Sequence, residues 1–204
     1  MVMADVEMTL WIRAQPDTSW VRTGYYFFLS HLLAAVTGTV GFLVAGWRLG
    51  SRAAFTAGLL PQVLACVLAL FVYAFASPPN AMLFLNARFL LGLVGAVSLF
   101  LYSAAFRRNE EERELGLALH WCAIPFLLAL LSVEDYQFWS GRAGLDPRQA
   151  GWAAQMSLTV VWGLYAAALL AIGFWRRSRA LRFAALALFG IAALKLVIVD
   201  YMQL

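Results

Sequence analysis

Charged residues are scarce in this sequence. Only 13% of its 204 residues are charged and 63% are hydrophobic, against about 25% and roughly 45–50% in soluble domains. A soluble domain of this size needs polar side chains over most of its exterior, and 15 Lys and Arg with 11 Asp and Glu do not supply them. The composition therefore excludes most soluble folds, and disordered or collagen-like chains with them. It indicates that lipid is the solvent.

Cysteine and histidine are also scarce, since the chain has two of each. Cys66 and Cys122 fall in different apolar runs, at expected depths that differ by about 8 Å, so we expect two free thiols and no disulfide framework. The chain has no CxxC pair, no His/Cys cluster with metal-ligand spacing, no nucleotide-binding loop and no GxSxG motif. We therefore expect neither a metal site nor enzymatic activity.

Long apolar runs dominate what is present. A membrane-spanning helix needs about 20 mostly apolar residues, because each residue rises about 1.5 Å and the hydrocarbon core is roughly 30 Å thick. Six such runs predict an all-α, polytopic six-helix bundle over residues 23–204, preceded by an extracytoplasmic tail at 1–22. Short separators make neighbouring helices antiparallel and the bundle a single domain. The runs are residues 24–46, 53–76, 87–106, 114–133, 151–175 and 180–201.

Basic residues predict the orientation of the bundle, because Lys and Arg near helix ends are retained on the cytoplasmic side. The first, third and fifth connections hold nine arginines and the other side holds five. Both termini are therefore expected outside the cytoplasm. The net charge of +4 reflects this topology, so no nucleic-acid partner is expected. The nine arginines are Arg48, Arg52, Arg107, Arg108, Arg113, Arg176, Arg177, Arg179 and Arg182.

His31 and His120 both lie within apolar runs, where a histidine is a functional-site hypothesis by default. Their flanks, FFLSHLL and LALHWC, would suit a tetrapyrrole, either haem or a chlorophyll-type pigment. Their expected depths differ by roughly 10 Å, which disfavours ligation of one iron by both. Two interpretations stay open. Each histidine ligates its own tetrapyrrole, or, as we favour, each hydrogen-bonds a carbonyl or hydroxyl at a helix interface.

Five charged residues are expected near the outer ends of the helices. Lys195 lies about fifteen residues into the last run, where an unpaired ammonium costs about 2.5–3.5 kcal/mol on insertion scales. Two pairings would offset such costs, Lys195 with Glu134 or Asp135, and Arg88 with Asp200. The cluster is interpreted either as an outward-facing site for a polar or anionic ligand or as a set of charges that hold helix ends together. We favour the second interpretation.

The end of the chain resembles a known family. Residues 157–204 are similar to the closing part of a large family of bacterial polytopic predicted membrane proteins of unknown function. Asn86 and Arg88 in LFLNARFLLGL also resemble the preceding helix pair of that family. The resemblance covers residues 80–204, is best over the last fifty and does not reach the first eighty. It implies an all-helical protein of the bacterial cytoplasmic (inner) membrane. The positions that carry it are Ser157, Trp162, Gly173, Arg176, Arg177, Arg182, Lys195 and Asp200.

Three functions are compatible with these features. The small size, the lack of a catalytic motif and the short connections favour a non-enzymatic accessory or scaffold subunit, with the lipid bilayer and other membrane proteins as partners. A transporter or ligand-binding protein would use the charged cluster, but no inverted repeat or pair of interrupted helices marks a midplane site. A pigment- or haem-binding subunit would use His31 or His120. The first of these is our prediction.

Overall fold

The computed structural model describes residues 19–72, 83–140 and 146–200, and within these ranges it is helical nearly throughout and contains no strand. The predicted all-α fold is confirmed, and six helices are long and apolar enough to cross a membrane. The helices are α2 (Ser19–Leu49), α3 (Arg52–Phe71), α4 (Ala87–Phe106), α5 (Arg113–Ser140), α6 (Pro147–Trp175) and α7 (Arg179–Lys195), with a 3-10 turn η2 (Glu110–Glu112) before α5 and a π-helical turn η3 (Leu196–Asp200) after α7.

Polar caps set where four of these helices begin. Ser51, Asn86, Asp146 and Ser178 each accept a hydrogen bond from the backbone N–H three residues on, over 3.3, 3.0, 2.8 and 3.4 Å, which satisfies one of the unpaired donors of a helix start. Asp146 is followed by Pro147 at the first helical position, where proline is favoured. As a result α6 begins at residue 147, ahead of the apolar run that starts at 151.

The other boundaries differ modestly from those predicted. The helix predicted at 87–106 is confirmed at both ends, whereas α5 continues to Ser140 beyond the predicted end at 133. It continues because Glu134 and Asp135, which a hydropathy pattern treats as a stop, are 1% exposed and lie against neighbouring helices. At the start of the bundle, α2 begins at Ser19, which lies inside the predicted tail of residues 1–22. Residues 1–18, 73–76 of the second run and 201 of the last lie outside the described ranges.

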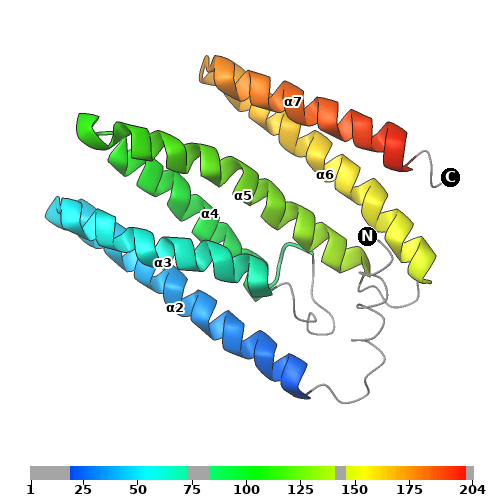
Figure 1. The fold of residues 1–204 in the computed structure, drawn as a ribbon, viewed down its shortest axis with the longest axis horizontal. Coiled ribbons are helices and arrows are strands. Elements are labelled where there is room, and N and C mark those ends of the chain that lie inside the picture. The colour runs from blue at the N-terminus through cyan, green and yellow to red at the C-terminus, as the bar shows by residue number, and fades with distance from the viewer. Residues whose placement is uncertain (1–18, 73–82, 141–145, 201–204) are drawn as a thin grey trace.

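The helices form three antiparallel hairpins, α2–α3, α4–α5 and α6–α7, that lie side by side in a row (Figure 1). The connections within the hairpins are residues 50–51, 107–112 and 176–178, and they lie at one end of the row together with the nine arginines. We call this the arginine end and the opposite end the open end. The middle hairpin contacts both neighbours, α4 against α2 and α3, and α5 against α6. The third hairpin therefore joins the row chiefly through the α5/α6 interface.

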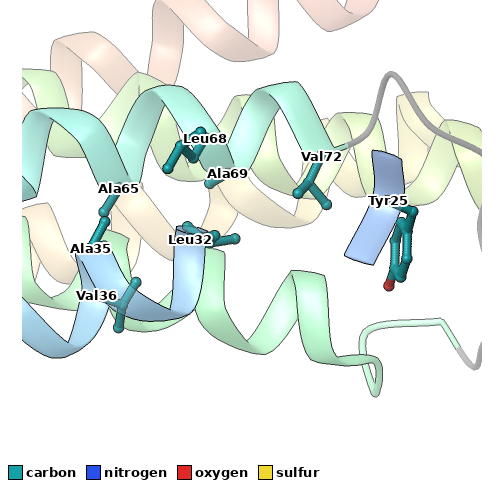
Figure 2. Close-up of a cluster of buried hydrophobic side chains, with 8 residues drawn as sticks. All are labelled: Tyr25, Leu32, Ala35, Val36, Ala65, Leu68, Ala69 and Val72. Carbon is teal, nitrogen blue, oxygen red and sulfur yellow. The ribbon is translucent and has the colours of Figure 1, made fainter. Parts of the chain in front are cut away.

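Small and branched apolar side chains pack the first hairpin. Alanines on both helices let the backbones approach closely, since they add little bulk at the contact. Tyr25 and Val72 lie at the end of this cluster that is nearest the open end (Figure 2). The buried members are Tyr25, Leu32, Ala35 and Val36 of α2, and Ala65, Leu68, Ala69 and Val72 at or just after α3.

Large apolar side chains cover the outside of the helices. Leu60, Leu164 and Phe183, on α3, α6 and α7, are 80%, 67% and 70% exposed. A soluble monomer does not present apolar surface on this scale, and lipid contact accounts for it. This apolar surface and the six apolar helices together are those of a multi-pass membrane protein.

Candidate functional site

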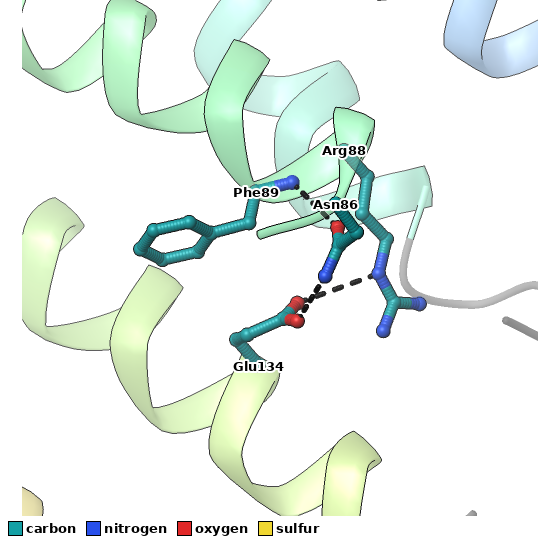
Figure 3. A network of polar contacts seen from close by, with 4 residues as sticks. All are labelled: Asn86, Arg88, Phe89 and Glu134. Atoms are coloured by element: carbon teal, nitrogen blue, oxygen red, sulfur yellow. Dashed lines mark hydrogen bonds and ion pairs between the residues drawn. The ribbon is translucent and has the colours of Figure 1, made fainter. Parts of the chain in front are cut away.

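Three polar side chains meet between α4 and α5 at the open end. The Nε of Arg88 lies 3.4 Å from Oε2 of Glu134, and both side chains are 2% exposed. Asn86, which caps α4, donates its side-chain amide to Oε1 of Glu134 and accepts from the backbone N–H of Phe89 over 3.0 Å (Figure 3). A cation on one oxygen and an amide on the other offset the cost of burying the Glu134 carboxylate.

Asp135, the next residue, is turned by about 100° around α5 and contacts α6. The hydroxyl of Ser157 donates to Oδ1 of Asp135 over 2.6 Å. Further along the same interface, Nε1 of Trp162 donates to Oγ of Ser132 over 2.9 Å, and the Tyr165 hydroxyl donates to a backbone carbonyl of α5 over 2.8 Å. Three side-chain hydrogen bonds therefore tie the third hairpin to the middle one.

Lys195 holds the two helices of the third hairpin together at the open end. Its ammonium donates to the backbone carbonyl of Gln155 over 2.9 Å and to Oγ1 of Thr159 over 2.8 Å. Both acceptors lie on α6, one turn apart. These bonds compensate part of the cost that a lysine incurs within a span.

The structure assigns different partners from those predicted. Arg88 pairs with Glu134, a partner that was not predicted, because the start of α4 lies beside the end of α5 within one hairpin; its expected pairing with Asp200 stays a prediction. Lys195 was expected on Glu134 or Asp135 and lies on α6, which stands between α7 and α5. The side chain of Asp200 lies outside the described part. The other four residues do not form one network and divide among the α4/α5, α5/α6 and α6/α7 interfaces.

A second polar cluster, which the sequence did not predict, lies deeper in the bundle. Gln62 on α3 is fully buried, and its Nε2 donates to the carbonyl of Gly95 over 3.0 Å while Ser98 donates to its Oε1 over 2.5 Å. Nearby, the hydroxyl of Tyr102 donates to the carbonyl of Thr39 over 3.0 Å. The available signal was a single glutamine in an apolar run, because an amide in lipid needs partners on a neighbouring helix.

The two histidines have different surroundings. His31 is exposed on α2, and its Nδ1 lies 2.7 Å from the carbonyl oxygen of Phe27. A carbonyl can only accept, so Nδ1 donates to it, and the tautomer with its proton on Nδ1 has its lone pair on Nε2. His120 on α5 is half-buried, with the rings of Phe100 and Trp121 at 5.5 and 6.1 Å between centroids. A ligand could therefore reach the exposed ring of His31, whereas aromatic rings partly cover His120.

Metal-binding groups do not cluster in the part of the chain that the structure describes. No set of three or more His, Cys, Asp or Glu side chains is placed there to hold a metal ion. Cys66 and Cys122 are both free thiols.

Comparison with protein families gives the assignment. The family model described as "Predicted membrane protein (DUF2339)" matches residues 1–204. The chain belongs to this family. No curated protein and no solved structure matches the chain.

The DUF2339 match extends the resemblance seen in the sequence. That resemblance was limited to residues 80–204, whereas the family match includes the first eighty residues as well. The resemblance depended on the spacing of Arg, Lys and Asp. No charged residue occurs between Arg22 and Arg48 or between Arg52 and Arg88, so the first hairpin offered no such spacing.

Proposed function

We propose that this chain is a non-enzymatic accessory or scaffold subunit of a larger assembly in the bacterial cytoplasmic membrane. The observation that carries the proposal is the use of polar side chains within the spans. Arg88 and Glu134, Asp135 and Ser157, and Lys195 with α6 each join one helix of the chain to the next. A protein whose intramembrane charges bind its own helices is suited to be a packing unit.

The short connections support the same proposal. At the arginine end the helices are joined by residues 50–51, 107–112 and 176–178, and Gly50 closes the first turn with a φ of +60° that glycine adopts at little cost. Connections of this length have no room for a domain outside the bilayer. Contact with partner proteins is therefore expected mainly through the apolar faces of the helices.

The arginine end is expected to face the cytoplasm by the positive-inside rule. The test is a Glu111→Cys variant, at an exposed position of the connection 107–112, in a chain with Cys66 and Cys122 replaced by serine. A membrane-impermeant maleimide should label Cys at position 111 only after the cytoplasmic face has been opened. Labelling in intact cells would show that the arginine end faces outward and would contradict the predicted orientation.

Native purification tests the scaffold proposal. The tagged chain is extracted with surrounding lipid into polymer nanodiscs, and the particle mass and its protein components are determined quantitatively. We expect a particle heavier than one copy, with the same partner chains at fixed stoichiometry in independent preparations. When this chain is deleted, we also expect those partner chains no longer to co-purify with one another. A partner-free particle that binds a small polar solute would support the ligand-binding alternative instead.

His31 supports a second candidate function, a pigment- or haem-binding subunit. Histidines that ligate a metal commonly donate their other ring N–H to a backbone carbonyl, as His31 does to Phe27. This leaves the Nε2 lone pair on an exposed side chain, and the Phe27 ring lies 4.2 Å from the imidazole between centroids.

An absorption spectrum of the same nanodisc preparation tests this candidate. A Soret or chlorophyll-type band that is lost in His31→Ala and kept in His120→Ala would support it. A spectrum with no band above the protein absorption, or a band equally strong in both variants, would remove His31 as a ligand.

A further inference from the structure

We infer that Asp135 is a proton-binding site within the membrane, a neutral carboxylic acid that carries an exchangeable proton on Oδ2, next to Glu134, which lies against the Arg88 guanidinium. This inference is independent of the scaffold proposal, because it concerns the state of one side chain and not the partners of the chain.

Glu134 and Asp135 are adjacent acids with equal burial and different partners. Each residue is 1% exposed. Glu134 has the guanidinium of Arg88 at 3.4 Å and the Asn86 amide as a second donor. Asp135 has the neutral hydroxyl of Ser157 on Oδ1. One carboxyl therefore meets a positive charge, and the other meets a neutral donor.

The second oxygen of Asp135 has no such partner. Oδ2 is buried without a hydrogen bond of good geometry from any described residue, although Trp139, one turn further along α5, lies beside the same carboxyl. An indole is a neutral donor, so it does not balance a full negative charge. Because the donors beside this carboxyl are neutral, Oδ2 is the oxygen on which we place the proton.

The charged groups on the surrounding helices are engaged elsewhere. On α4, Arg88 lies on Glu134. On α7, Lys195 lies on α6, and Arg148 at the start of α6 is exposed. Within the described ranges, no Lys or Arg nitrogen forms an ion pair with Asp135. An isolated buried carboxylate is so costly that the group takes up a proton instead.

The position of this proton matters to the fold. Asp135 lies at the α5/α6 interface, through which the third hairpin chiefly joins the row. Loss of the proton would place an uncompensated negative charge between the two helices. The packing of the third hairpin against α5 therefore depends on Asp135 remaining protonated.

Infrared spectroscopy of the full chain in nanodiscs tests the inference. A protonated carboxyl group absorbs at a higher frequency than a carboxylate, and its band shifts when the proton exchanges for deuterium. At neutral pH we expect such a band in the unmodified protein, shifted in D2O, lost in Asp135→Asn and retained in the matched variant Glu134→Gln. A spectrum without the band, or a band lost in Glu134→Gln and retained in Asp135→Asn, would overturn the inference.

Isotope labelling covers the case in which Asp135→Asn does not fold. The labelled chain carries Asp200→Asn, which removes the aspartate of the last predicted span from the spectrum. It is produced with carboxyl-13C aspartate or, separately, with carboxyl-13C glutamate. We expect the band to move to lower frequency with labelled aspartate and to stay in place with labelled glutamate. The opposite pattern would assign the proton to Glu134 and contradict the inference.

Discussion

Replacing Glu134 with glutamine tests whether the buried ion pair holds α4 to α5. The Nε–Oε2 distance of 3.4 Å corresponds to an attraction of about 5 kcal/mol at an effective dielectric constant of about 20. Glutamine retains the shape and an oxygen for the Asn86 amide, but it removes the negative charge beside the Arg88 guanidinium. Removal of one partner of a buried pair costs about 3–5 kcal/mol, and we expect the free energy of unfolding to fall by about that amount.

The matched control is the exposed pair at the arginine end. Nη1 of Arg52 lies 3.1 Å from Oε2 of Glu111, closer than the buried pair, yet these side chains are 66% and 79% exposed. Exposed pairs contribute less than about 1 kcal/mol, so Glu111→Gln should change stability little.

The free energy of unfolding is measured in lipid-like micelles by steric trapping for Glu134→Gln, Glu111→Gln and the double variant Arg88→Met with Glu134→Gln. The double variant should lose less stability than Glu134→Gln alone, because it leaves no buried charge. Equal losses for Glu134→Gln and Glu111→Gln would refute the reasoning, since burial and not distance is the claimed cause.

Two further substitutions have defined outcomes. In Gly58→Ala the new Cβ would overlap the hydroxyl of Tyr102, which is fully buried, and we expect a loss of about 1–3 kcal/mol of stability; Gly41→Ala, with nothing within 4 Å of its new Cβ, should be nearly neutral in the same assay. Lys195→Met removes the hydrogen bond to Thr159 and should lower stability by about 1–3 kcal/mol. Retained stability together with lost binding of a polar solute would contradict the structural role of Lys195.

Local features of the sequence predicted the helices well. The span at 87–106 was predicted to the residue, because Asn86 is both a polar break in the apolar run and the cap of α4. The end of α5 was missed by about two turns. A carboxylate usually marks the water interface, and hydropathy alone does not reveal that a guanidinium on another helix accompanies Glu134 into the bundle.

The sequence identified the members of the charged cluster but not their partners. Arg88, Glu134 and Lys195 stood out because charge inside a span is costly. Their pairing depends on which helices are neighbours, and a row of hairpins places α6 between Lys195 and α5. A closed ring of the same six helices would give other pairs. Gln62 was overlooked for the same reason, since its partners Gly95 and Ser98 lie on another helix.

By itself the sequence determined that the chain crosses the membrane with six helices, because hydropathy and backbone hydrogen bonding within a helix are local properties of the chain. The tertiary structure decided the order of the hairpins, the partner of each intramembrane charge and the contrast between Glu134 and Asp135. Those depend on contacts between residues far apart in the sequence. Two adjacent acids that look equivalent in the sequence face different helices, one with a cation and one without.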